Sequence, residues 1–244
     1  MNKFLKNWGL PLIVLLLGGA ASLLQSWSLG TADDSGLLLR GHISQVLSWI
    51  VTAGVLGFLF FVTRPLTQAP KYSFNFPASL VGGIGSALGA LGIFLSAYSL
   101  FDTGSDSLTM ITAYGSLLAA GALVFSGFCR VKGKTFNILP HCAVCFWFLL
   151  LLICQYRLWS AEPQMQLYAF QLLATVFLMV ATYQRACFHA GLGNRQSYVF
   201  FRLAGAYFCI AALPGSEFWI FYLCTAFWSV TDLCNLTPIH QEGR

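Results

Sequence analysis

The chain consists almost entirely of apolar stretches separated by short polar connections. A helix needs about 20 residues to cross the hydrocarbon core of a bilayer. Eight stretches approach or reach this length, and their predicted bounds are 8–28, 42–63, 78–101, 108–129, 138–157, 166–186, 197–213 and 216–236. We therefore expect an all-α integral membrane protein, a compact bundle of eight transmembrane helices built as four antiparallel hairpins.

The connections alternate in charge, which predicts how the helices are oriented. One set is basic and contains Lys3, Lys6, Arg64, Lys71, Arg130, Lys132, Lys134, Arg185 and Arg195. The other set is acidic apart from Arg40 and Arg157, and its acids are Asp33, Asp34, Asp102, Asp106, Glu162 and Glu217. Loops rich in Lys and Arg stay in the cytoplasm. Both termini are therefore expected on the cytoplasmic side of the cell membrane.

The seventh stretch is the weakest of the eight. Arg202 interrupts it, and Pro214 and Gly215 end it early. If it does not cross, the bundle has seven helices and the C-terminus moves outside. The first stretch is interpreted as a retained anchor, because the apolar part of a cleaved signal peptide is only about 7–15 residues long.

Composition agrees with a single polytopic membrane domain over residues 1–244. The chain is 57% hydrophobic and 9% charged, whereas soluble domains carry about 25% charged residues. The net charge of +5 is spread over the predicted inner connections instead of forming one patch. This distribution excludes a nucleic-acid partner and favours membrane lipids.

The third stretch is rich in small residues. Gly82, Ser86 and Ala90 recur at intervals of four, and Gly85 and Gly89 do the same. Such spacing lets another helix backbone approach closely. We expect the Gly82–Gly92 face to pack inside the bundle, and the alternative is that it joins a second copy of the chain or a partner membrane subunit.

Charges within membrane spans are costly and are the first candidates for a functional site. Arg202 lies about one turn from the inner end of the seventh stretch, and Asp232 lies about one turn from the inner end of the eighth. In an antiparallel hairpin these residues share one depth, so we expect an ion pair. Its role is either to fix the packing of the hairpin or to couple the protein to a proton or ion.

A second candidate is an outer mouth around the end of the fifth stretch. Arg157 is a basic residue on the acidic side and is expected to pair with Glu162 or Glu217. An arginine there could hold a carboxylate or phosphate, and the alternative is an interfacial aromatic belt. The mouth candidates are Gln155, Tyr156, Arg157, Glu162, Tyr168, Gln171 and Glu217.

The cysteines and histidines give only a weak metal signal. Cys142 and Cys145 share a helix face, and Cys187 and His189 could join them only if two inner connections meet. We expect neither a metal nor a cofactor. The sequence also lacks the hydrolase, metalloprotease, P-loop and dinucleotide-binding motifs, so it gives no ground for an enzyme.

The sequence favours a small-solute transporter, or the membrane subunit of one. The alternative is a non-catalytic scaffold, sensor or accessory subunit. The two classes predict different interiors. A transporter is expected to have a polar cavity near the membrane midplane reached by Gln25, Gln155, Gln171 or Tyr183, whereas a scaffold is expected to be packed dry throughout.

Overall fold

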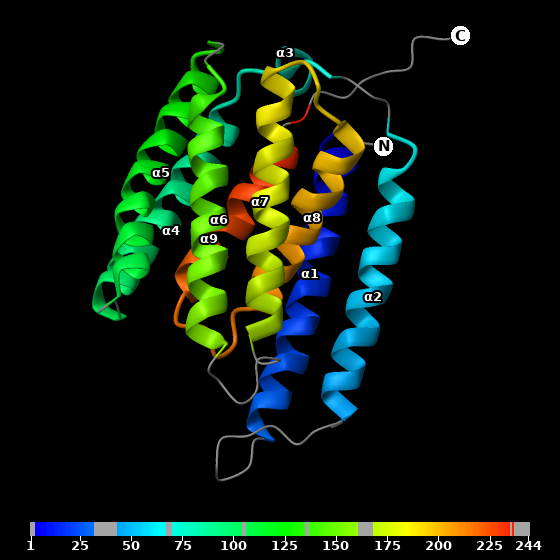
Figure 1. Ribbon diagram of the computed structural model, residues 1–244. Helices are drawn as coiled ribbons and strands as arrows, with labels where there is room; N and C mark the ends of the chain where they lie inside the picture. The colour runs from blue at the N-terminus through cyan, green and yellow to red at the C-terminus, as the bar shows by residue number, and fades with distance from the viewer. Residues whose placement is uncertain are drawn as a thin grey trace.

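The computed structural model describes residues 3–31, 43–66, 70–103, 106–134, 137–160, 168–234 and 236. Within these residues the fold is entirely helical, without a strand (Figure 1). Its helices are α1 (Lys3–Gly30), α2 (Ile43–Thr63), α3 (Tyr72–Asn75), α4 (Leu80–Thr103), α5 (Ser107–Val131), α6 (Leu139–Trp159), α7 (Ala169–His189), α8 (Arg195–Ala211) and α9 (Trp219–Cys234).

In the part of the chain that the structure describes, five helices are long and apolar enough to cross a membrane, namely α1, α2, α4, α5 and α6. This agrees with a membrane-embedded helical bundle. The remaining predicted stretches correspond to α7, α8 and α9, of which α8 has 17 residues and α9 has 16. The single turn α3 was not predicted, and it precedes Phe76 and Pro77 in the connection to α4.

Helices α8 and α9 form the centre of the bundle. Helix α8 packs against α1, α2, α7 and α9, and α9 packs against α1, α4 and α8. The α1–α2 pair and the α4–α5 pair lie on opposite sides of this centre (Figure 1). Most side chains of α8 are buried. Because neighbouring helices shield α8 and α9 from lipid, these two helices tolerate polar residues that a lipid-facing helix does not.

The glycines of α4 bring this helix close to α9. A Cβ atom at Gly89 would lie 2.9 Å from Cγ of Trp228, and one at Gly92 would lie 2.6 Å from Cβ of Cys224. Real Cβ atoms do not approach other atoms so closely, so a larger residue would push the two helices apart. The chain thus uses the Gly82–Gly92 face for its own packing, and association with a second subunit stays a prediction.

The described charged residues gather at two ends of the bundle. At the basic end, Arg130 of α5, Arg185 of α7 and Arg202 of α8 converge on Asp232 of α9. At the opposite end, Asp106 before α5 pairs with Arg157 of α6. Acidic residues 33, 34 and 162 lie outside the described part of the chain.

Candidate functional site: a buried arginine cluster

One carboxylate and three guanidinium groups meet inside the basic end. Asp232 accepts hydrogen bonds from Arg130, from Arg185 and from the hydroxyl of Tyr198. Nη1 of Arg185 lies 2.7 Å from Oδ2 of Asp232, and Nη2 of Arg202 lies 3.6 Å from the same oxygen. We call Arg130, Arg185, Arg202 and Asp232 the arginine cluster. It joins four helices, α5, α7, α8 and α9.

The arginine cluster is closed to solvent and carries excess positive charge. The side chains of the three arginines are each 1% exposed and that of Asp232 is 0% exposed. Three positive charges and one negative charge leave a net charge of +2 among these described residues. Nε and Nη2 of each arginine have no hydrogen-bond partner in the described structure. Buried polar groups normally find partners, and exceptions point to a water, an ion or a functional site.

Aromatic rings surround the guanidinium groups. The ring of Phe76 lies 5.5 Å from Cζ of Arg130 and 5.1 Å from Cζ of Arg185. The ring of Trp228 lies 3.7 Å from Cζ of Arg202. Each such contact contributes about 0.5–2 kcal/mol. The rings offset part of the cost of burial, but they bring no negative charge.

Local structure explains how these side chains reach one place. Gly82 of α4 leaves room for Arg130, because a Cβ atom there would lie 2.6 Å from Cζ of that arginine. Asn75 of α3 holds the connection that carries Phe76, since its Nδ2 donates to the Lys71 carbonyl at 2.9 Å and its Oδ1 accepts from Arg195 at 3.2 Å.

Sequence reasoning identified only half of the arginine cluster. Arg202 and Asp232 were expected to pair, and the structure places them 3.6 Å apart. Arg130 and Arg185 were interpreted as orientation signals in inner connections, although both lie within helices. Tyr198 was missed, and its spacing of four from Arg202 on α8 could have indicated it. The role of the Arg202–Asp232 pair, structural or coupling, stays a prediction.

The outer-mouth candidates do not form one site among the described residues. Gln155 is buried, its Nε2 donates to Tyr222 at 3.0 Å, and its Oε1 accepts from Thr175 at 2.9 Å. Gln171 is buried beside them, because its carbonyl lies 3.5 Å from the Tyr222 hydroxyl. Tyr156 instead is exposed on the surface of α6. The two glutamines therefore belong to an interior hydrogen-bond network that joins α6, α7 and α9.

Arg157 pairs with an acid that was not among its expected partners, and its pairing with Glu162 stays a prediction because that residue lies outside the described part of the chain. Its Nη1 lies 2.7 Å from Asp106, where α5 packs against α6. Glu217 lines a separate pocket with Tyr98 and Phe218. Tyr168 stacks on Trp159 with ring centroids 4.5 Å apart. Asp106 can pair with Arg157 because Asp106 directly precedes α5, and α5 packs against α6. The spacing of these residues along the chain did not reveal that they are close.

The weak metal candidates lie near the basic ends of α6 and α7, where Cys145 is close enough to Cys142 and Cys187 to interact with them electrostatically. In the described residues, no group of three or more His, Cys, Asp or Glu side chains could hold a metal ion. Cys142 is exposed, and Cys145 lies 3.7 Å from the Met179 carbonyl. Cys187 is half-buried near the end of α7. His189 stacks on Tyr72 with ring centroids 4.0 Å apart.

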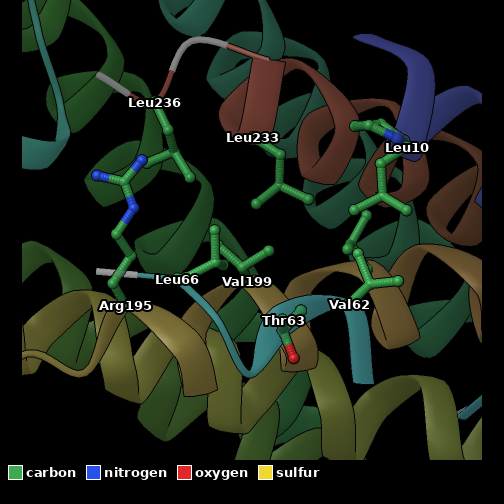
Figure 2. A pocket seen from close by; sticks show the side chains of 10 residues that line it. Leu10, Val62, Thr63, Leu66, Arg195, Val199, Leu233 and Leu236 are labelled. Carbon is green, nitrogen blue, oxygen red and sulfur yellow. The ribbon is translucent and has the colours of Figure 1, made fainter. Parts of the chain in front are cut away.

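Two cavities lie at the basic end on either side of the end of α2. One, of about 170 Å³, is lined mostly by leucine and valine from α1, α2, α8 and α9, with Arg195 at its edge (Figure 2). The other, of about 390 Å³, lies between α2 and α8 and contains Arg64 and Gln196. Of the side chains expected to reach a midplane cavity, Gln25 is buried on α1 and Tyr183 is 56% exposed.

The geometry of the arginine cluster is the main basis for inferring function. No family model, curated protein or solved structure matches this chain.

Proposed function

We propose that this chain is an eight-span membrane transport protein, or the membrane subunit of a transporter, that binds a small anion at the arginine cluster. The net charge of +2 on the fully buried arginine cluster is the observation that carries this proposal. Transferring a charged group from water to a protein interior costs several kcal/mol unless opposite charge compensates it. Asp232 compensates one arginine, and a bound anion compensates the other two.

The unpartnered nitrogen atoms favour an oxyanion. Arg130 and Arg185 bind Asp232 through Nη1, which leaves the edge formed by Nε and Nη2 without a partner on each. Two parallel N–H groups match two oxygens of a carboxylate, sulfate or phosphate. A dianion such as sulfate or hydrogen phosphate also balances the net charge of +2. We therefore expect a doubly charged oxyanion to bind more tightly than a halide.

Eight crossings are supported by the packing of α8 and α9. At one end of α8, Arg195 lies beside Asn75 of the basic end. After its other end, a Cβ atom at Gly215 would lie 3.1 Å from Leu29, near the end of α1. The hairpin thus extends over nearly the full length of α1. Helix α9, at 16 residues, rises only about 24 Å, and the protein around it offsets this shortness.

The orientation follows from the positive-inside rule, with the basic end and both termini in the cytoplasm. A membrane-impermeant thiol reagent on intact cells tests it. Native Cys142 is exposed at the basic end, and Asp102 is exposed near the opposite end of α4. Asp102→Cys is expected to react from outside, whereas Cys142 reacts only after the cells are opened. Labelling of Asp102→Cys only from the inside contradicts this orientation.

Thermal unfolding of the purified protein tests the anion site. A ligand that binds only the folded state raises the melting temperature in a saturable way. At constant ionic strength, sulfate or phosphate is expected to do so, and chloride to do so less. Arg202→Gln is the variant of choice, because Arg202 is the arginine farthest from Asp232. We expect its affinity for the dianion to fall about tenfold or more, since hydrogen bonds to charged groups contribute about 1.5–3 kcal/mol.

Arg157→Gln is the matched control, because it removes an exposed arginine at the opposite end. It is expected to keep the full response to sulfate. An equal response in wild type and Arg202→Gln, or no response in wild type, overturns the anion site. Uptake of radiolabelled sulfate or phosphate into proteoliposomes then tests transport.

A sensor or accessory subunit is the second candidate function, and the Gln155 network favours it. The polar atoms of Gln155 form hydrogen bonds with Tyr222 and Thr175 between α6, α7 and α9. Protein contacts therefore fill this part of the interior. Saturable anion binding without uptake supports the sensor or accessory function, and uptake abolished by Arg202→Gln supports transport.

A further inference from the structure

The cavity between α2 and α8 has the features of a lipid site. It is lined by Phe60, Thr63 and Arg64 from the end of α2, and by Gln196, Ser197, Phe200 and Phe201 from the start of α8. Thr63 donates its hydroxyl to the Leu59 carbonyl of its own helix, at 2.9 Å. Three of these seven side chains are aromatic rings, and the single charged residue, Arg64, lies at the basic end.

Helix α2 leaves this cavity open to the membrane. Within the described residues α2 packs mainly against α1 and α8, and many of its large side chains are exposed, including Phe60 at 55% and Phe61 at 70%. Trp49 stacks on Phe170 of α7, with ring centroids 5.3 Å apart. At the basic end, Gln196 donates to the Arg64 and Leu66 carbonyls at 2.6 and 3.1 Å. These contacts hold α2 beside the bundle while a cavity remains near its end.

Arg64 supplies the charge that selects the occupant. Its side chain is exposed, and no described carboxylate forms an ion pair with it. A cation at the end of an apolar helix lies at headgroup level, where it attracts anionic lipid. Arg195 lines the neighbouring leucine-lined cavity (Figure 2). It differs from Arg64 because it is buried and donates to Asn75.

We infer that this cavity binds one anionic phospholipid, with the phosphate at Arg64 and an acyl chain against Phe60, Phe200 and Phe201. The site is independent of the arginine cluster and of the proposed transport function, since it needs only a membrane-embedded bundle. Binding there fills the space between α2 and α8 and ties α2 to the centre of the fold.

Native mass spectrometry of delipidated protein with added phosphatidylglycerol or phosphatidylcholine tests this site. Wild type is expected to bind one phosphatidylglycerol more tightly than phosphatidylcholine. Arg64→Gln is expected to lose about fivefold in phosphatidylglycerol affinity, the effect of one basic residue near anionic lipid. Its phosphatidylcholine affinity is expected to fall less, because the choline cation of that headgroup offsets the charge of the phosphate. Lys132→Gln is the matched control, because Lys132 is also near the basic end but lies over Phe128 of α5.

Two further measurements distinguish the contribution of the lipid headgroup to binding from that of the acyl chain. Soluble glycerol phosphate is expected not to displace the lipid, because it lacks the chain that fills the aromatic cavity. Phe60→Gln is expected to weaken both lipids, since Phe60 contacts the chain and not the phosphate. The inference is overturned if Arg64→Gln keeps the lipid preference, if Lys132→Gln loses it equally, or if glycerol phosphate competes.

Discussion

Replacing Asp232 with asparagine removes the only carboxylate that the described residues place in the arginine cluster. Asparagine keeps the size of the side chain and one acceptor oxygen, so the main change is the loss of charge. Three buried arginines are then left with a net charge of +3 instead of +2. The closest atoms are 2.7 Å apart for Arg185 and 3.6 Å apart for Arg202.

Two estimates agree on the size of this effect. A pair of charges about 4 Å apart is worth about 4 kcal/mol at an effective dielectric constant of about 20, a value that also serves for buried sites. Removing one partner of a buried ion pair typically costs about 3–5 kcal/mol, because the remaining charge stays buried. We expect Asp232→Asn to lower the free energy of unfolding by about 3–5 kcal/mol. This is a large fraction of the about 5–15 kcal/mol that stabilises a typical protein.

A thiol-reactive fluorescent dye measures this unfolding in detergent. Cys129, Cys154, Cys209 and Cys234 are buried and react only when the bundle opens, whereas Cys142 is exposed and sets the baseline. Titration with a denaturing detergent then gives the change in free energy.

Asp106→Asn is the matched control for this measurement. It removes an aspartate whose ion pair is largely exposed, at 62% for Arg157 and 42% for Asp106. Exposed pairs contribute at most about 1 kcal/mol. If Asp232→Asn costs no more than Asp106→Asn, the reasoning from buried charge is refuted. Sulfate is also expected to stabilise Asp232→Asn more than wild type, because the site is then more positive.

Two glycine substitutions test the packing that positions the arginine cluster, and a glutamine substitution tests whether the Gln155 network is separate from it. Gly89→Ala is expected to lower the free energy of unfolding by about 1–3 kcal/mol by overpacking against Trp228. Gly121→Ala is its control in the same unfolding assay and is expected to have no effect, because no atom lies within 4 Å of a Cβ atom at that position. Gly82→Ala is expected to displace Arg130 and to weaken sulfate binding along with stability, measured by the sulfate-dependent melting temperature. Gln155→Leu is expected to lower the free energy of unfolding by about 1–2 kcal/mol through lost hydrogen bonds. It is expected to leave the sulfate-dependent rise in melting temperature unchanged. Loss of that rise contradicts the separation of the Gln155 network from the arginine cluster.

Periodicity and charge predicted where helices occur because both are local properties of the sequence. The stretch 138–157, for example, corresponds to α6 at Leu139–Trp159. Pairing between helices that are distant in the sequence is not local, so periodicity and charge did not predict it. Arg157 was assigned to acids near it on the predicted outer surface, but the neighbour of α6 is α5, which brings Asp106 to it. The glycines of α4 indicated a close helix contact without indicating that α9 makes it.

The arginine cluster shows the same limit in its clearest form. Arg130 and Arg185 lie at helix ends, where a basic residue is also what the positive-inside rule requires. Residue type and position therefore could not separate an orientation signal from a buried site. Only burial distinguishes them, since Arg130 and Arg185 are enclosed whereas Arg64 at the end of α2 is exposed.

The imbalance of charge is what favours binding over a purely structural role. An ion pair that only holds helices together needs equal numbers of positive and negative charges. One arginine paired with Asp232 would meet this need with the lowest desolvation cost. The second and third arginines add repulsion without a further carboxylate among the described residues. A cluster of this kind is most stable when something negative enters it. Under the proposed function, the binding free energy of the anion offsets the cost of burying two surplus cations. The stability of the four helices then depends on the concentration of the ligand.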